Sequence, residues 1–190
     1  MKVVHVCTGA VRQVRINGRS VASAIAKQPV AGPVAVKPLG LEGDEQADLT
    51  VHGGLAKAVY AYPAEHLPFW RTVRAQARVG LWDEPVPPGL FGENLLVEGL
   101  TEDRLWIGDR LLLPHCVLAV SEPRMPCFKF AAAMGFAKAV KLMGQSGWCG
   151  TYLAVIEPGQ VSAGDTAQLV PGPREVNLAE LFRARVRPGD

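Results

Sequence analysis

Ile107-Gly108-Asp109-Arg110-Leu111-Leu112-Leu113 and Ala163-Gly164-Asp165-Thr166-Ala167-Gln168-Leu169-Val170 are similar segments, and in each a Gly-Asp turn leads into an apolar run. Glycine reaches a positive φ without steric cost, and an aspartate side chain can cap a turn. We therefore interpret both segments as turns that lead into β-strands. Their similarity predicts a mainly β fold, a barrel built from strand–turn–strand units.

Other short apolar runs, each bounded by Gly, Pro, Asp or Asn, predict further strands. With the two above, the expected strands cover residues 2–7, 34–36, 58–62, 95–97, 111–113, 117–120, 151–156 and 166–170. Helices are expected at 64–79, with Pro68 in the first turn, at 127–134 and 137–143 on either side of Gly135, and at 178–185 after a capping Asn177. A Pro-Gly-Pro breaker at 171–173 separates this last helix. We expect one domain over residues 1–172 and a short C-terminal helical tail over 173–190.

The composition is that of an ordinary globular protein, with 48% hydrophobic residues and a net charge of +2 over 190 residues. This balance excludes an acidic tail protein and gives no charge signature of binding to nucleic acid or a membrane surface, so neither is an expected partner. No apolar run approaches the roughly 18 residues that span a bilayer, and the first apolar stretch is too short for a signal peptide. We therefore expect a cytoplasmic protein whose four cysteines are free thiols.

Residues 40–59, GLEGDEQADLTVHGGLAKAV, gather carboxylates, a glutamine, His52 and Lys57 around the pair Gly53-Gly54. Glycines let a ligand approach the backbone, whose N–H groups can hold an anion. His52 and Lys57 add donors for phosphate or carbonyl oxygens. The alternative is a polar turn whose Asp and Gln side chains bond to local backbone groups. The sequence leaves both interpretations open.

Cys127 follows a proline and opens an expected helix in Ser121-Glu122-Pro123-Arg124-Met125-Pro126-Cys127-Phe128-Lys129. The helix dipole, together with Arg124 and Lys129, favours a thiolate, which serves as a nucleophile, a persulfide carrier or a soft-metal ligand. The alternative is a buried structural thiol, as we expect for Cys7 and Cys116. Cys149 lies in a turn bracketed by glycines and is a candidate for a position near the site.

Two further groups are candidates for a binding role. Asn94 either reads the edge of a heteroaromatic ligand through its amide or holds a tight turn next to Gly92. Arg12, Arg15, Arg19 and Lys27 lie in a stretch of 41 residues without Asp or Glu. They form either a solvated basic face or one wall of an anion pocket. No dinucleotide-binding, P-loop, nucleophile-elbow or zinc-protease motif is present.

Four blocks, in this order, resemble the MOSC domain family, and within it the YiiM type. They are residues 41–54, residues 91–95 with 99–101 and 107–109, residues 126–129, and residues 146–150 with 158–159 and 164–165. The resemblance covers about residues 1–170. It implies a MOSC-type β-barrel with a few short helices that binds the molybdenum cofactor, a pterin carrying a dithiolene, a phosphate and molybdenum. YiiM-type proteins also have a C-terminal helical domain, to which only residues 177–186 of this chain would contribute.

The cysteine that is regarded as the family's molybdenum ligand corresponds to Cys127, and a soft thiolate suits such a metal. The YiiM-type and amidoxime-reducing relatives reduce N-hydroxylated compounds such as hydroxylaminopurines and amidoximes. We therefore expect Cys127 to be both metal ligand and catalytic residue. The expected cofactor-binding residues are Arg12, Lys27, His52, Gly53, Gly54, Lys57, Asn94, Arg124 and Lys129.

The expected partners of such a reductase are a small N-hydroxylated substrate and a separate electron-donor protein, because the chain has no ferredoxin-type cysteine cluster. The alternative function is that of a non-catalytic carrier. In that case Cys127 holds a persulfide, or hands sulfur or the molybdenum cofactor to another enzyme.

Overall fold

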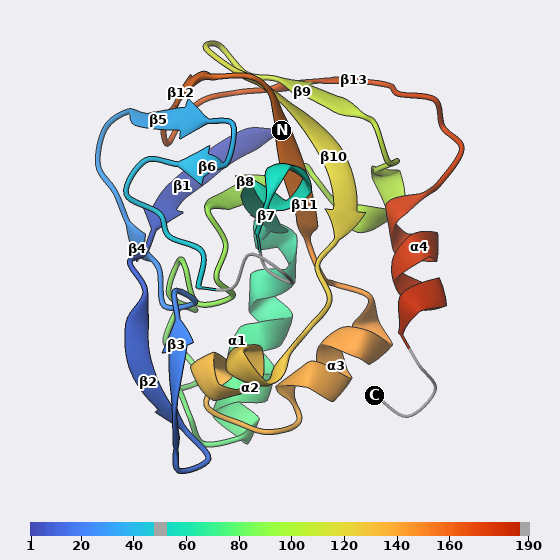
Figure 1. Ribbon diagram of the computed structural model, residues 1–190. Helices are drawn as coiled ribbons and strands as arrows, with labels where there is room; N and C mark the ends of the chain where they lie inside the picture. Colours follow the sequence, from blue (N-terminus) through green and yellow to red (C-terminus); the bar gives the residue numbers. More distant parts are fainter. Residues whose placement is uncertain (48–52, 187–190) are drawn as a thin grey trace.

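The computed structural model describes residues 1–47 and 53–186, which form a mainly β fold with several short helices (Figure 1). The strands are β1 (Lys2–Thr8), β2 (Arg12–Ile16), β3 (Arg19–Ser23), β4 (Gln28–Pro29), β5 (Val34–Lys37), β6 (Gly40–Leu41), β7 (Val59–Pro63), β8 (Leu95–Glu98), β9 (Arg110–Leu112), β10 (Val117–Pro123), β11 (Thr151–Glu157), β12 (Gly159–Val161) and β13 (Gln168–Val170). The α-helices are α1 (Leu67–Gln76), α2 (Phe128–Met134), α3 (Ala139–Ser146) and α4 (Leu178–Arg185). Short 3₁₀ turns are η1 (Leu55–Lys57), η2 (Ala64–His66) and η3 (Glu102–Arg104).

The largest sheet has eight strands in the order β13-β9-β10-β11-β7-β8-β1-β4. Its neighbours are antiparallel except for β7 and β8, which are parallel. A parallel pair needs a crossover connection, and here the chain makes it through η2 and α1. Two smaller sheets, β12-β5-β6 and the hairpin β2-β3, complete the strands.

The closed barrel expected from the sequence is not confirmed. Within the described residues the strands of the large sheet are ordered from β13 to β4, without a continuous ladder between its ends. The two sides of the sheet do approach each other, since Lys2 of β1 and Thr166, which precedes β13, form an isolated bridge. On either side of that bridge, the backbone N–H of Val3 donates to Asp165 O and that of Ala167 to Met1 O.

Two hydrophobic cores lie against the large sheet, and β7 contributes to both. Val59 and Ala61 belong to the first core, whereas Tyr60 and Tyr62 belong to the second. Successive side chains of a strand point to opposite faces, so a strand that is buried throughout must serve two cores. The second core contains the buried side chains of α1, α2, α3 and Phe182 of α4. It therefore brings the helices together on one side of the sheet.

The expected strands are all present, with ends shifted by up to three residues. The helical expectations are also confirmed: Pro68 lies in the first turn of α1, and Gly135 ends α2 with φ 82°. Asn177 caps α4 through its side chain, which accepts hydrogen bonds from the backbone N–H groups of Ala179 and Glu180. Among the described residues, no helix is both long and apolar enough to cross a bilayer.

The hairpin β2–β3 was not expected from the basic character of residues 12–23. Its turn residues Asn17 and Gly18 have φ of 50° and 79°, the positive values that a tight two-residue hairpin turn requires. An Asn-Gly pair between alternating side chains is the sequence signal that predicts such a turn. In Figure 1 the hairpin extends away from the large sheet below β4.

Candidate functional site

A cavity opens where β3, β7, β11 and α2 meet the loops that follow β6 and precede β8. The empty space in and in front of it is about 610 Å³, which includes the open space at its mouth. The lining residues are Ser23, Ala24, Ile25, Lys27, Asp44, Glu45, Gln46, Ala47, Lys57, Tyr60, Phe91, Gly92, Asn94, Arg124, Cys127, Lys129 and Tyr152. Among these described residues, four cations outnumber two carboxylates.

Most of the candidate residues meet in this cavity. The six that line it are Lys27, Lys57, Asn94, Arg124, Cys127 and Lys129. Three others do not: Arg12 is exposed on β2, and Gly53 and Gly54 precede η1, the turn that ends at Lys57. His52 lies outside the described residues. The cavity thus joins residues that are up to about a hundred positions apart in the chain.

Lys27 is a buried cation whose partner is Asp44, with which it forms an ion pair. The same carboxylate accepts the backbone N–H of Gly9 at 2.9 Å, and Glu45 accepts that of Val11 at 2.6 Å. The acidic loop therefore holds the chain between β1 and β2. Gln46 bonds to the nearer backbone of residues 39, 54 and 57, as the interpretation of a polar turn predicts, and the same loop lines the cavity.

Arg124 is the most buried cation of the cavity, with 3% of its surface exposed. Its Nη1 donates to Met143 Sδ at 3.5 Å, and its guanidinium lies over the Phe130 ring, 4.7 Å from the centroid. No carboxylate of the described residues forms a salt bridge with it. Burial acts to lower the pKa of Arg124, but interactions with Tyr60 and Cys127 outweigh it and the pKa is raised. The cavity therefore holds a permanent positive charge beside Cys127.

The other two cations reach the cavity from its rim. Lys57 Nζ lies 3.9 Å from Glu122 Oε1 and 5.9 Å from the centre of the Tyr152 ring. Lys129 Nζ donates to the carbonyl oxygen of Ala22 at 2.8 Å, which ties α2 to the end of the basic hairpin. Each ammonium group carries three donors, so it can donate to an anion in addition to its contacts within the protein.

Cys127 differs from the other three cysteines in its surroundings. It is partly exposed and caps the start of α2, where its carbonyl oxygen accepts the N–H of Phe130 at 3.0 Å. The other thiols are buried, as expected for Cys7 and Cys116. Burial raises the pKa of Cys7 to about 12 and that of Cys116 to about 11, and it raises that of Cys149 well above its ordinary value. These three therefore remain protonated at neutral pH, and none lines the cavity.

Asn94 is buried and holds neighbouring strands in place. Its Oδ1 accepts the backbone N–H of Tyr60 at 3.0 Å, and its Nδ2 donates to Cys7 O at 3.3 Å. The side chain thus supports the β7–β8–β1 part of the sheet beside the cavity. Asn94 therefore bridges two strands through its side chain, whereas the expected alternative was a tight turn, and it also lines the cavity wall.

Glu93 was not among the candidates, although it is fully buried next to Asn94. Its carboxylate accepts the backbone N–H of Gly89 at 2.5 Å and that of Phe91 at 3.0 Å. Burial raises the pKa of Glu93 to about 7, although these N–H groups and the charge of Lys27 act in the opposite direction. Glu93 holds the loop that supplies Phe91 to the cavity.

Gly89 allows that loop to pack against Lys27. It has φ 84°, and a Cβ at this position would lie 2.3 Å from Lys27 O. No side chain fits there without moving the backbone that carries the buried cation. The Gly-rich sequence before β8 is therefore required by packing and places Lys27 at the cavity.

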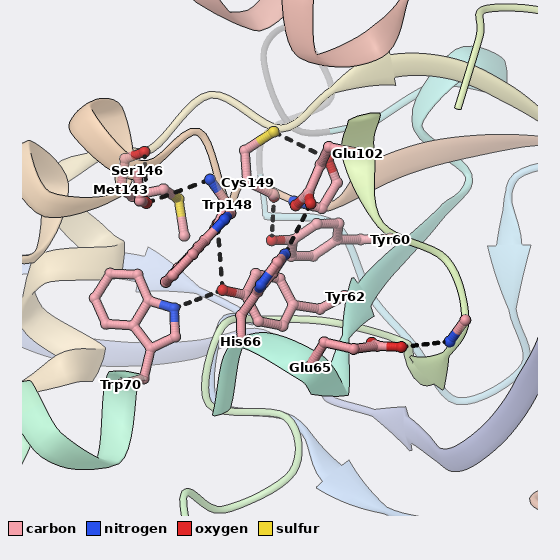
Figure 2. Close-up of polar contacts among 12 residues, drawn as sticks. Tyr60, Tyr62, Glu65, His66, Trp70, Glu102, Met143, Ser146, Trp148 and Cys149 are labelled. Carbon is pink, nitrogen blue, oxygen red and sulfur yellow. Dashed lines mark hydrogen bonds and ion pairs between the residues drawn. The ribbon is translucent and has the colours of Figure 1, made fainter. Parts of the chain in front are cut away.

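A network of aromatic and polar side chains lies behind the cavity (Figure 2). Tyr60, which lines the cavity, donates from its hydroxyl to Cys149 O at 2.7 Å. Glu102 accepts the backbone N–H of Gly150 at 2.7 Å and pairs with His66 Nε2 at 2.8 Å. These contacts fix residues 149–150 against the sheet, so Cys149 supports the wall of the cavity from behind and does not line it.

The imidazole of His66 stacks on the Trp148 ring, with ring centres 4.7 Å apart. Trp70 Nε1 donates to the Tyr62 hydroxyl at 2.6 Å, and that hydroxyl donates to Trp148 O at 3.2 Å. Part of this network had a signal in the sequence, because Tyr60 and Tyr62 alternate with smaller residues in an expected strand. In the structure that strand is buried on both faces. Among the described residues, no group of three or more His, Cys, Asp or Glu side chains is placed to hold a metal ion.

Comparisons with known proteins match nearly the whole chain. A family model for the MOSC domain matches residues 48–168. The protein YiiM of Escherichia coli (strain K12) is 40% identical over 159 residues, which cover 83% of this chain and 68% of that protein. A protein of Gibberella moniliformis named "Reductase" is 34% identical over 188 residues, which cover 96% of this chain and 32% of that protein. The crystal structure of YiiM from Geobacillus stearothermophilus matches with a TM-score of 0.75 and 31% identity, over 95% of this chain and 81% of that one.

Proposed function

Because the chain belongs to the MOSC domain family, we propose that it binds the molybdenum cofactor in the cavity described above and reduces N-hydroxylated compounds. Cys127 is the metal ligand in this proposal. The relative named "Reductase" supports an oxidoreductase, although this chain spans about a third of that protein. The likeness to YiiM over most of both chains supports the family-wide association with this cofactor.

One observation carries the proposal: the partly exposed thiol of Cys127 and the buried guanidinium of Arg124 line the same cavity. A ligand that combines a phosphate with a soft metal needs cationic donors and a thiolate close together. The described lining supplies four cations and one sulfur, so the residues present fit such a ligand.

The protein's residues would divide the work of binding. Lys57, Arg124 and Lys129 supply charge for the anionic part of the ligand. Lys27, which is held by its ion pair with Asp44, supplies a further donor to the cavity. Tyr60 and Phe91 add apolar lining, while Asn94 holds the strands beside them through its bonds to Tyr60 N and Cys7 O.

The proposed reaction breaks an N–O bond, consumes two electrons and two protons, and releases an amine or amidine and water. When bound, the molybdenum cofactor supplies the redox chemistry, and the protein supplies binding, orientation and charge. We propose that the electrons come from a separate donor protein. The permanent charge of Arg124 beside Cys127 favours the thiolate form that metal binding requires.

The test is the molybdenum content of the protein made in a host that synthesises the cofactor. We expect near-stoichiometric molybdenum in the unmodified protein and a loss of most of it in Cys127→Ser, because a hydroxyl is a poor ligand for a soft metal. Cys116→Ala is the matched control, since this thiol is buried in the first core away from the cavity. Elemental analysis per chain provides the measurement, and hydroxylaminopurine reduction follows with the loaded protein.

Equal molybdenum in Cys127→Ser and the unmodified protein would overturn the ligand role. The absence of molybdenum from all three proteins, in a host shown to supply the cofactor, would overturn the cofactor proposal. In that case, release of sulfane sulfur on cyanolysis, lost in Cys127→Ser, would identify the chain as a persulfide carrier.

A further inference from the structure

Cys127 lies between two cavities of opposite character. The first is the cationic cavity described above. The second, of about 530 Å³ including its open mouth, is lined by Cys127 together with Met125, Pro126, Phe128, Val140, Gly144 and Val186. None of these six side chains carries a charge. Cys127 thus contributes to the lining of a site suited to anions and of a site suited to apolar groups.

The second cavity is built by three helices and the segment before α2. Val140 and Gly144 lie one turn apart on α3 and therefore share a face. Val186 follows α4, and Figure 1 shows α3 between α2 and α4. Phe128 at the start of α2 is 55% exposed, so an aromatic face stands at the opening next to Cys127.

We propose that this apolar cavity is the substrate subsite and that Gly144 determines how large a substrate it accepts. This inference rests on the proposed function. If an anionic cofactor occupies the cationic cavity with its metal at Cys127, the open apolar cavity offers an approach to the same residue from another side. It takes the uncharged aromatic or alkyl body of an N-hydroxylated compound, with the N–O group directed toward Cys127. Substrates that carry phosphate are disfavoured, because none of the described residues that line this cavity is a cation.

Gly144 is the lining residue at which a side chain can be added on the cavity-lining face of α3. It lies within α3 and lacks a side chain, and leucine is a better helix former than glycine. Gly144→Leu therefore places an isobutyl group on the face that lines the cavity. Gln145→Leu is the matched control, because Gln145 is exposed and the next residue along a helix points about 100° away.

The first measurement uses the metal-free protein and two neutral probes, benzamidoxime and the smaller acetamidoxime, with affinities from ligand-observed NMR. We expect benzamidoxime to bind the unmodified protein and Gln145→Leu equally. In Gly144→Leu we expect its affinity to fall by about tenfold or more, since the leucine takes the space of the ring. A lack of benzamidoxime binding to the unmodified protein, or equal binding to Gly144→Leu, would overturn the subsite.

The second measurement uses the molybdenum-loaded protein. We expect Gly144→Leu to keep its molybdenum, and its kcat/KM for benzamidoxime to fall about tenfold further than its kcat/KM for the smaller acetamidoxime. An equal loss for both substrates would contradict size selection by Gly144. A protein without molybdenum would overturn the proposed function, whereas the NMR result would still decide on the apolar subsite.

Discussion

At the scale of single residues, this chain buries polar groups only with partners. No buried side-chain nitrogen or oxygen atom in the described residues lacks a hydrogen bond. Two of them hold backbone segments in place: Asn94 bonds to two strands, and Glu102 bonds to the segment after α3. A buried polar group without a partner costs about 1–3 kcal/mol, so each of these contacts makes one loop conformation strongly preferred. The wall of the cavity is thereby held by Asn94, which lines it, and by Glu102, which does not.

Glu93 predicts a pH dependence of stability. Its pKa is about 7 in the folded protein against an ordinary value of 4.5. Between these values the folded state keeps a proton that the unfolded chain has lost, so stability falls as the pH rises through this window. In Glu93→Gln this contribution is absent. We expect the stability of the unmodified protein relative to the variant to fall by up to about 3 kcal/mol from pH 4.5 to pH 7.

Urea unfolding at several pH values measures the difference. The exposed Glu175→Gln variant controls for the substitution itself. The loss of a backbone hydrogen bond lowers the free energy of unfolding equally at every pH. The titration of Glu93 instead changes the slope of that free energy against pH, so the two effects can be separated. Parallel slopes for the unmodified protein and Glu93→Gln would show that this carboxyl does not titrate in the window.

At the scale of elements, α4 depends on one residue at its start. Asn177 Oδ1 accepts the N–H groups of Ala179 and Glu180, and its Nδ2 donates to Asp103 O at 3.0 Å and Leu105 O at 3.2 Å. The same side chain thus caps the helix and fastens it to η3. We expect Asn177→Ala to lower the free energy of unfolding by about 2 kcal/mol, from the lost cap and the two carbonyl groups left without this donor.

Chemical denaturation provides the measurement, with Arg183→Ala as the control on the exposed face of the same helix. A surface substitution of this kind changes stability by about 0.5 kcal/mol or less. Equal stability of the two variants would mean that Asn177 contributes no more than a solvated residue.

At the scale of the whole molecule, α4 connects the two cores. Leu178 belongs to the first core and Phe182 to the second, and both are fully buried. One turn of helix therefore spans the edge between them. We propose that residues 173–186 fold together with the rest of the chain, although the sequence pattern predicts a separate tail that begins at residue 173.

Phe182→Ala tests this proposal. Removal of a fully buried phenyl ring costs about 3–5 kcal/mol where the cavity cannot collapse. We expect a loss in that range within a single unfolding transition that fluorescence and circular dichroism report alike. Val176→Ala, at a position 41% exposed, is the control and should change little. A loss below about 1 kcal/mol, or an early separate transition, would indicate that α4 folds independently.

The sequence by itself determined the local features. Patterns within a few residues predict strands such as β1 and β8, the proline in the first turn of α1 and the Asn177 cap. They do so because propensity and capping depend only on residues close together in the chain. Cys127 was likewise distinguished from Cys7 and Cys116 by its neighbours in sequence. The hairpin β2–β3 carried an equally local signal in Asn17-Gly18, which the basic composition of the stretch obscured.

Only the tertiary structure decided which residues meet. Lys27, Asn94 and Arg124 share a cavity because the sheet order places β7 between β8 and β11, which no local pattern specifies. The same packing leaves Arg12 exposed and places Val186 and Cys127 in the lining of one apolar cavity. The physical reason is that burial and long-range strand pairing are properties of the packed chain. They therefore decide a side chain's surroundings independently of its neighbours in sequence.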